Sequence, residues 1–214
     1  VVNLGSAVWT GDNIGDGGKV TMTKASKWEG NNEGSNTNLT MEYNTWNGNN
    51  IGADADITLS DNASWTGNNT GANAAITLNG ESVWTGYSSA DELTLALNNS
   101  TWNNTGSSKV QSVTANKGVV NMTNANSGDV TIGNYSGSMV VLYSHNITDD
   151  ATSNMTGGKV VTVNGGNITI GSAATGAEIT LRTDRNGLNL ESGIYTDKNL
   201  VNATLDALAN KLFY

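Results

Sequence analysis

Residues 57–86 read ITLSDNASWTGNNTGANAAITLNGESVWTG, and this stretch contains the same pattern twice. Each copy begins with Ile-Thr-Leu and reaches Trp-Thr-Gly a few residues later. The two short segments alternate apolar and polar residues, which is typical of β-strands and not of helices. The Gly- and Asn-rich residues between them favour tight turns. The stretch therefore predicts two short strands and intervening turns in each copy.

The same pattern recurs along the first half of the chain. Five of the six tryptophans have glycine two residues later and a pair of apolar residues eleven and thirteen residues later. The tryptophans are Trp9, Trp28, Trp46, Trp65, Trp84 and Trp102, at spacings of 19, 18, 19, 19 and 18 residues. A repeat of this length, with short strands and no helical periodicity, predicts an all-β solenoid, a parallel β-helix in which each repeat is one coil.

The residues around the tryptophans predict that the indoles point inward. Side chains alternate between the two faces of a strand, so Trp shares a face with the residue two positions before it. Lys27 and Glu29 flank Trp28 and would be costly to bury. The residues two positions before the tryptophans are short: Ala7, Ser26, Asn44, Ala63, Ser82 and Ser100. We therefore expect an internal column of stacked indoles, whereas an exposed aromatic platform for sugars would need the opposite orientation.

The apolar-Thr-apolar segments predict an outward row of threonines. The row comprises Thr21, Thr40, Thr58, Thr77 and Thr94, and similar triplets farther along contain Thr131, Thr162, Thr169 and Thr180. β-branched residues suit strands, and neighbouring threonines add small favourable terms, so we interpret the row as a soluble sheet face. An ice-binding array would need Thr-x-Thr pairs, which only Thr21 and Thr23 supply.

Beyond Trp102 the repeat loosens without ending. Apolar positions continue at Val120 and Met122, Val130 and Ile132, Val141, Val161 and Val163, Ile168 and Ile170, Ile179 and Leu181, and Leu188 and Leu190. We expect a β-helix of roughly eleven coils over residues 1–195. Residues 196–214 differ, because apolar residues recur there at helical spacing after Asp197, a suitable N-cap. These are Leu200, Val201, Leu205, Leu208 and Leu212. They predict a short amphipathic helix that caps the solenoid.

Composition excludes several classes of function. The 214 residues include 33 Asn, 26 Gly, no Pro and no Cys, with a formal net charge of −9. We assign the surplus of Asn and Gly to turns, because both tolerate left-handed backbone conformations. The absence of Cys excludes disulfides and thiolate metal sites. The ten Lys and Arg are scattered and form no basic stripe, which argues against nucleic acid as a partner.

Several segments resemble the passenger regions of pertactin-like bacterial autotransporters, the class that includes diffuse-adherence and self-associating adhesins. Residues 57–86 follow the residue pattern of that family, which is apolar-x-apolar, Asn, Ser-x-Trp and Gly. Residues 118–146, GVVNMTNANSGDVTIGNYSGSMVVLYSHN, resemble its C-terminal passenger region. Residues 158–184, GKVVTVNGGNITIGSAATGAEITLRTD, form a second approximate copy. The resemblance covers roughly residues 1–190 and rests on structural motifs.

The resemblance implies a right-handed parallel β-helix displayed at the surface of a Gram-negative-type cell. In that family a C-terminal β-barrel anchors the passenger in the outer membrane, and we expect none of that barrel in this sequence. The family pattern carries no catalytic residues and no cofactor or metal onto this chain. We therefore expect a non-enzymatic passenger that mediates adhesion or self-association. Its partner would be a host glycan, a matrix protein or an identical chain, with membrane contact only through the barrel.

The alternative is a carbohydrate-active β-helix enzyme that acts on polysaccharide with clustered carboxylates. The candidate acid pairs are Asp54 and Asp56, Asp91 and Glu92, and Asp149 and Asp150. We interpret them as solvated turn charges, since no acidic partner recurs one coil away. His145 is the only histidine, which excludes a multi-histidine metal site. Ser144 beside it would point to the opposite face of a strand, so the two predict no catalytic pair.

Two further patterns predict no site. Residues 11–16, GDNIGD, offer oxygen ligands but fit neither the EF-hand loop nor the glycine-rich calcium-binding nonapeptide. Asn-x-Ser/Thr sequons, as at Asn62, Asn134 and Asn146, arise freely in a chain so rich in Asn and Thr, so glycosylation cannot be inferred from them. The sequence thus predicts a rod without identifying its ligand-binding residues.

Overall fold

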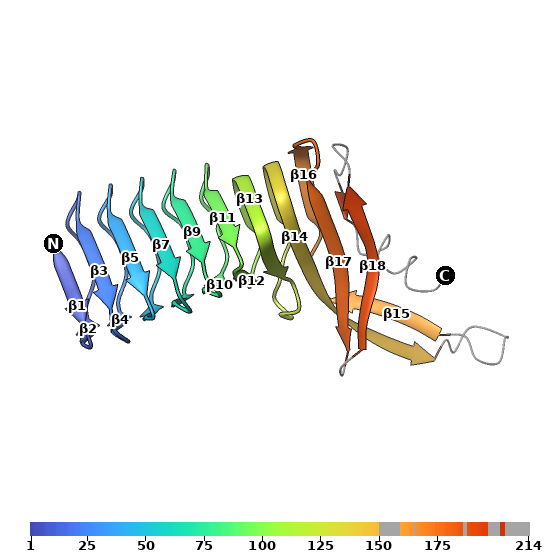
Figure 1. Ribbon diagram of the computed structural model, residues 1–214, viewed down its shortest axis with the longest axis horizontal. Coiled ribbons are helices and arrows are strands. Elements are labelled where there is room, and N and C mark those ends of the chain that lie inside the picture. Colours follow the sequence, from blue (N-terminus) through green and yellow to red (C-terminus); the bar gives the residue numbers. More distant parts are fainter. Residues whose placement is uncertain (150–158, 165, 186–187, 197–201, 204–214) are drawn as a thin grey trace.

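The computed structural model of the chain describes residues 1–149, 159–164, 166–185, 188–196 and 202–203. These residues form a parallel β-solenoid of about 7 turns with a spacing of about 19 residues. The coils stack along one axis, with the N-terminus at one end and the long strands β13 and β14 towards the other (Figure 1). The prediction of an all-β parallel solenoid is confirmed, and the prediction of roughly eleven coils is wrong.

The first strand of each coil joins a parallel ladder, called here the first ladder. Its strands are β1 (Val2–Gly5), β3 (Lys19–Thr23), β5 (Asn38–Glu42), β7 (Asp56–Ser60), β9 (Ala75–Asn79) and β11 (Thr94–Asn98). Apolar residues pair with apolar residues, as Leu39 does with Ile57 and Ile57 with Ile76. These side chains are buried, and the alternating residues between them face out, because successive residues of a strand point to opposite sides.

The tryptophans lie on a second parallel ladder. Its strands are β2 (Val8–Thr10), β4 (Lys27–Glu29), β6 (Thr45–Asn47), β8 (Ser64–Thr66), β10 (Val83–Gly86) and β12 (Thr101–Asn104). Each indole stacks on the next, and the ring centroids of Trp46 and Trp65 are 4.6 Å apart. Trp28 and the four tryptophans after it are fully buried, while Trp9 at the end of the column is partly buried. The inward column is confirmed, and an exposed aromatic platform is ruled out.

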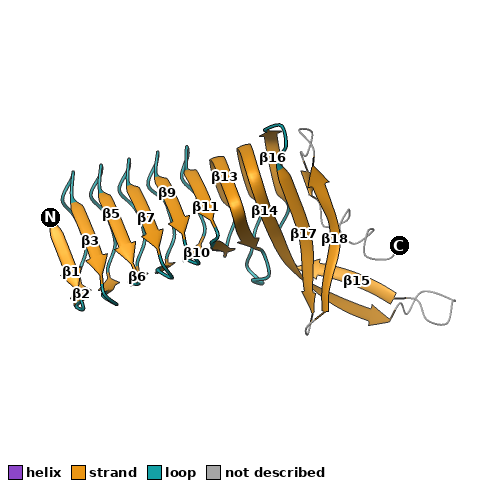
Figure 2. Ribbon diagram, viewed as in Figure 1, coloured by secondary structure: helices purple, strands orange, loops and turns teal. Residues whose placement is uncertain are grey.

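Two long strands, β13 (Ser108–Asn121) and β14 (Val130–Asp149), belong to both ladders. Residues 112–116 of β13 pair with β11, and residues 119–121 pair with β12. Residues 130–142 of β14 then pair with β13 along the length of β13, and Figure 2 shows the two strands as continuous arrows. Val120 and Val141 pair in turn after Trp102, so valine continues the column that the indoles begin.

The coil number is lower than predicted because the repeat lengthens and part of the chain forms antiparallel pairs. Partners in successive coils are 22 residues apart at Thr114 and Ser136, and 38 apart at Asn134 and Ser172. Strands β16 (Ile168–Ala173) and β17 (Glu178–Arg185) pair parallel with β14. In contrast, β15 (Lys159–Asn164) and β18 (Leu188–Thr196), each expected to belong to a further coil, pair antiparallel with β14 and β17.

The helical cap predicted for residues 196–214 is not observed in the part of that segment that the structure describes. Residues Asn202–Ala203 form β19, which pairs antiparallel with β16 at Ile168 and Thr169. These two residues are therefore in a strand and not in a helix, because the edge of β16 offers them backbone partners. Asp197 and residues 198–201 and 204–214 lie outside the described residues.

Candidate binding surface

A glycine carbonyl of the preceding coil accepts a hydrogen bond from each tryptophan after Trp9. The Nε1 of Trp65 donates to the carbonyl of Gly48 at 2.7 Å. A Cβ on Gly67 would lie 1.8 Å from the same oxygen, so only glycine fits two residues after this tryptophan. Equivalent hydrogen bonds join Trp28 to Gly11, Trp46 to Gly30, Trp84 to Gly67 and Trp102 to Gly86. The Trp-x-Gly motif therefore lets the glycine backbone of adjacent coils approach closely while the indole nitrogen finds a carbonyl acceptor.

A buried column of amides lies in the segments that lead from the second ladder to the first ladder of the next coil. The Nδ2 of Asn32 donates to Oδ1 of Asn50, and that of Asn50 to Oδ1 of Asn69, each at 2.7 Å. Asn13 begins the column and Ser88 ends it. Asn32, Asn50 and Asn69 are 0% exposed, and each also donates to a backbone carbonyl two residues later. The surplus of asparagine was predicted to lie in turns, so this buried column was not foreseen, although Asn stands four residues after each of the first four tryptophans.

The outward residues of the first ladder form an aligned column. Thr21, Thr40, Thr58 and Thr77 pair in turn, and Ala96, Thr114 and Ser136 continue the series. The four threonines are only partly buried beside fully buried neighbours, which confirms that they face outward.

Thr94 faces outward, as predicted, between the buried Leu93 and Leu95, but it does not lie in this column. Thr94 pairs with Ala75, two positions before the column, because the triplet of this coil is Leu95-Ala96-Leu97 and Ala96 takes the threonine position. The later threonines lie elsewhere. Thr131 pairs with Thr169 between β14 and β16, Thr180 pairs with Val140, and Thr162 pairs antiparallel with Asn146.

We call the outward residues of the first ladder from Ala75 to Ser138 the polar face. Its members are Ala75, Thr77, Asn79, Thr94, Ala96, Asn98, Ser112, Thr114, Asn116, Asn134, Ser136 and Ser138. None of these twelve is charged. Hydrogen bonds between coils hold several of the side chains, as from Asn98 Nδ2 to Asn79 Oδ1 at 2.9 Å and from Ser136 Oγ to Thr114 Oγ1 at 3.3 Å. The face thus presents hydroxyl and amide groups at the spacing of adjacent strands.

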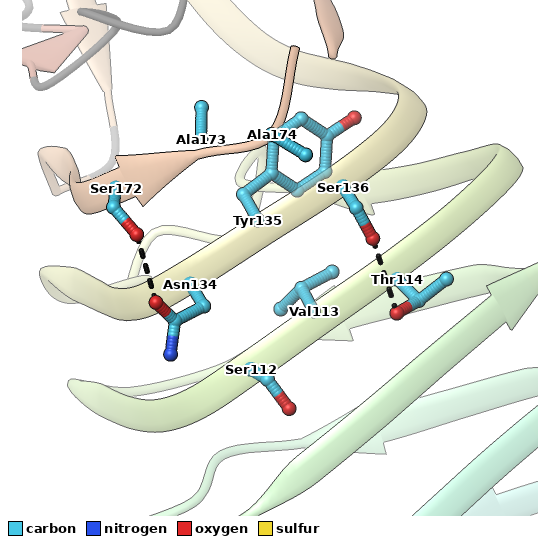
Figure 3. A pocket seen from close by; sticks show the side chains of 9 residues that line it. All are labelled: Ser112, Val113, Thr114, Asn134, Tyr135, Ser136, Ser172, Ala173 and Ala174. Carbon is cyan, nitrogen blue, oxygen red and sulfur yellow. Dashed lines mark hydrogen bonds between the residues drawn. The ribbon is translucent and has the colours of Figure 1, made fainter. Parts of the chain in front are cut away.

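A shallow pocket of about 280 Å³ lies at the C-terminal end of the polar face. Figure 3 shows its lining side chains, which come from β13, β14 and the end of β16. The Oγ of Ser172 donates to Oδ1 of Asn134 at 2.7 Å across one side of the pocket. Ser112, Thr114 and Ser136 add hydroxyl groups, and no acidic or basic residue lines the pocket. Such a lining can exchange hydrogen bonds with a neutral polar ligand.

Two tyrosines anchor the coils beneath this end of the molecule. Tyr135 is 3% exposed, and its hydroxyl donates to the carbonyl of Glu178 at 2.7 Å. Tyr143 is 1% exposed, and its hydroxyl donates to the carbonyl of Gly166 at 3.4 Å. Burial raises the pKa of both phenols, and the charges of Glu178 and Asp129, respectively, raise it further. Both hydroxyls therefore remain protonated and serve as donors that hold the structure.

The structure gives Asp54 and Asp56 amide neighbours in the adjacent coils and places Asp91 and Glu92 in an exposed turn. Asp54 accepts from Nδ2 of Asn73 at 3.1 Å, so its neighbour in the next coil is an amide and not a second carboxylate. Asp56 likewise faces the amide of Asn38 at 3.4 Å in the preceding coil. Asp91 and Glu92 are exposed in a turn, where Asp91 lies 4.0 Å from Lys109 Nζ. Asp149 ends β14, and Asp150 lies outside the described residues.

The other residues considered for chemistry occupy structural positions. Ser144 donates to the carbonyl of Thr123 at 3.5 Å, and His145 pairs through its backbone with Val163. In residues 11–16, the carboxylates of Asp12 and Asp16 accept from the backbone nitrogens of Asn31 and Ser35 at 2.6 and 2.8 Å. Among the described residues, no three His, Cys, Asp or Glu side chains gather where they could hold a metal ion.

The fold and its repeated surface define this chain as a repeat protein of the parallel β-solenoid class. Comparison with protein-family models, with curated proteins and with solved structures gave no match. In the part of the chain that the structure describes, no helix has the length and apolar character needed to span a membrane.

Proposed function

We propose that this chain is the passenger of a pertactin-like autotransporter, a right-handed β-helix displayed at the cell surface and anchored at the outer membrane in the full-length protein. It acts without catalysis, in adhesion or in self-association. The observation that carries the proposal is the polar face, in which uncharged hydroxyl and amide groups repeat in register from β9 to β14. The sequence resemblance to that family supports the same function.

The proposed mechanism is geometric. Each coil contributes a few weak hydrogen-bonding groups, and the stacked coils hold these groups at a constant spacing. A repetitive partner, such as a glycan chain, an extended matrix protein or an identical rod, can contact several coils at once. Because further contacts are then intramolecular, the total affinity can greatly exceed that of one contact. The inter-coil hydrogen bonds pre-order the side chains and so lower the entropic cost of binding.

A binding comparison with two matched variants tests the proposal. Thr114 is exposed on the polar face, and Thr66 is exposed on the second ladder, so Thr114→Lys and Thr66→Lys make the same change on different faces. Wild-type protein would be measured on immobilised glycans and matrix proteins, and by sedimentation for self-association. We expect one of these interactions to weaken at least about tenfold in Thr114→Lys and to persist in Thr66→Lys.

Two results would overturn the proposed function. One is measurable turnover of an acidic or neutral polysaccharide by the purified chain, which would identify it as an enzyme. The other is a complete absence of binding to glycans, matrix proteins and identical chains. Equal binding by both variants would instead show that the contact lies outside the polar face.

A further inference from the structure

The first coil of the described chain has an apolar surface that no described residue covers. We call this surface the N-terminal face; it comprises the outer side of β1, Trp9, Asn13 and Gly15. Val2, Leu4 and Trp9 are only partly buried, whereas their partners in the next coil, Val20, Met22 and Trp28, are at most 1% exposed. Among the described residues strand β1 pairs only with β3, so one edge of its backbone has no strand beside it.

Two hydrogen-bonding groups on this face, Nε1 of Trp9 and Oδ1 of Asn13, lack the described partners that their counterparts have in the next coils. Each later tryptophan donates through Nε1 to a glycine carbonyl of the preceding coil, but Nε1 of Trp9 bonds to no residue that the structure describes. The Oδ1 of Asn32 accepts from Nδ2 of Asn13, whereas Oδ1 of Asn13 accepts from no described donor. The face therefore presents an indole donor that is satisfied in all five following Trp-containing coils, and an amide acceptor that is satisfied at Asn32, Asn50 and Asn69.

Gly15 supplies an independent observation. It begins the row continued by Gly34, Gly52 and Gly71, where a Cβ would lie 2.0–2.2 Å from a glycine carbonyl of the preceding coil. These three positions therefore need glycine for lack of space. A Cβ on Gly15 would meet nothing within 4 Å, and its backbone φ is not in the left-handed region. Gly15 thus leaves room for a carbonyl that the described chain does not supply.

We propose that the N-terminal face is a docking surface for one further coil of the same repeat, a segment with the sequence Trp-x-Gly-x-Asn. The interface would continue the one already present between the Trp-containing coils. The glycine carbonyl of the added coil accepts from Trp9, its asparagine donates to Asn13, and its indole stacks on the free face of Trp9. Its backbone pairs with β1. The carbonyl of its glycine that corresponds to Gly15 fills the space beside Gly15.

The chain itself provides the probe. Residues 56–74, DITLSDNASWTGNNTGANA, form one coil that leads into Ala75, and Ala75 pairs with Asp56 in the first ladder. A copy of these 19 residues fused directly before Val1 would place its tryptophan, glycines and asparagine in register with Trp9, Gly15 and Asn13. Three further proteins complete the set: a fusion with the same residues scrambled, the Gly15→Ala variant without a fusion, and Gly15→Ala with the fused coil.

Amide hydrogen exchange of Val2–Gly5 reports docking without depending on added tryptophan. We expect the fused coil to slow this exchange by about tenfold and the scrambled segment to leave it unchanged. Gly15→Ala should have no effect in the unfused chain, and should remove the protection in the fused chain. Equal exchange in the fused and scrambled proteins would overturn the proposal. So would a dimer of the unfused chain whose Val2–Gly5 amides lose protection on dilution, because a second copy would then cover the face.

Discussion

Trp65 and Gly48 lie in adjacent coils, and the indole Nε1 of Trp65 donates to the carbonyl of Gly48 at 2.7 Å. That carbonyl also faces Gly67, two residues after Trp65, and excludes any side chain there. One oxygen thus requires both a donor and a glycine from the next coil. This double requirement explains why Trp-x-Gly repeats as a unit, and it predicts which substitutions a coil tolerates.

Gly67→Ala should destabilise the protein by about 3 kcal/mol. The new Cβ would lie 1.8 Å from the carbonyl oxygen of Gly48, and the φ of +154° is unfavourable for alanine, so the coils must separate locally. Gly15→Ala is the matched control, because its Cβ meets nothing within 4 Å, and it should change stability by less than about 0.5 kcal/mol. Urea unfolding followed by circular dichroism measures both. Equal midpoints for the two variants would contradict the steric argument.

Trp65→Phe should cost about 2 kcal/mol, since it leaves the buried carbonyl of Gly48 without its side-chain donor and loses part of the stacked ring. Trp9→Phe should cost less than half as much, because Trp9 is partly exposed and its Nε1 has no described partner. Thermal unfolding of the two variants, compared with wild type, provides the measurement. A larger loss at Trp9 would show that the end of the column is more tightly packed than its middle.

The sequence predicted the strands and the direction of their side chains because both depend on local alternation. Charged residues beside Trp28 were sufficient to orient the whole indole column, since one strand face cannot bury Lys27 and Glu29. The coil number was not predictable in this way. Apolar pairs such as Val161 and Val163 look the same in a parallel coil and in an antiparallel strand, and only long-range pairing with β14 distinguishes the two.

The surplus of asparagine has two physical causes, and composition suggested only one. Asn36, Asn62, Asn73 and Asn99 have positive φ between 47° and 62°, as turn chemistry predicts. Asn32, Asn50 and Asn69 instead form the buried amide column. Their regular position after tryptophan was a usable signal. The polar face was only partly predictable, because its register beyond Thr77 depends on the register of β11 with β13 and β14.

Asn50→Asp should destabilise the protein strongly at neutral pH. Asn50 accepts from Asn32 and donates to Asn69, and a carboxylate cannot donate. Burial would raise the pKa of the introduced carboxyl group above the ordinary aspartate value near 3.9. A raised folded-state pKa favours folding below the unfolded-state pKa and loses that effect as pH rises. The difference in unfolding free energy from wild type should therefore be about 3 kcal/mol at neutral pH and smaller near pH 4.

Asn68→Asp is the matched control for the amide column. Asn68 is half-buried on the outside of the coil, and its Oδ1 accepts from the backbone nitrogen of Tyr87 at 3.1 Å. A carboxylate can still accept this hydrogen bond, so the substitution should cost less than about 1 kcal/mol at either pH. Unfolding in urea at both pH values, each against wild type, tests the pair. An equal and pH-independent loss in both variants would exclude the proposed role of the buried donors.

Buried tyrosines should make the protein sensitive to alkali. Burial raises the pKa of Tyr143 above its ordinary value of 10.0, so the folded state holds the phenol proton more tightly than the unfolded state does. The resulting stabilisation is complete below about pH 10 and is lost as pH rises through the raised pKa.

Tyr143→Phe should thus lower the unfolding free energy slightly near pH 8, because a hydrogen bond to Gly166 is lost. The same substitution should reduce the decline of the unfolding free energy above about pH 10. Tyr43→Phe, at a side chain 55% exposed, is the control and should retain the wild-type pH dependence. Parallel curves for Tyr143→Phe and wild type up to about pH 11 would show that this buried phenol does not govern the alkaline transition.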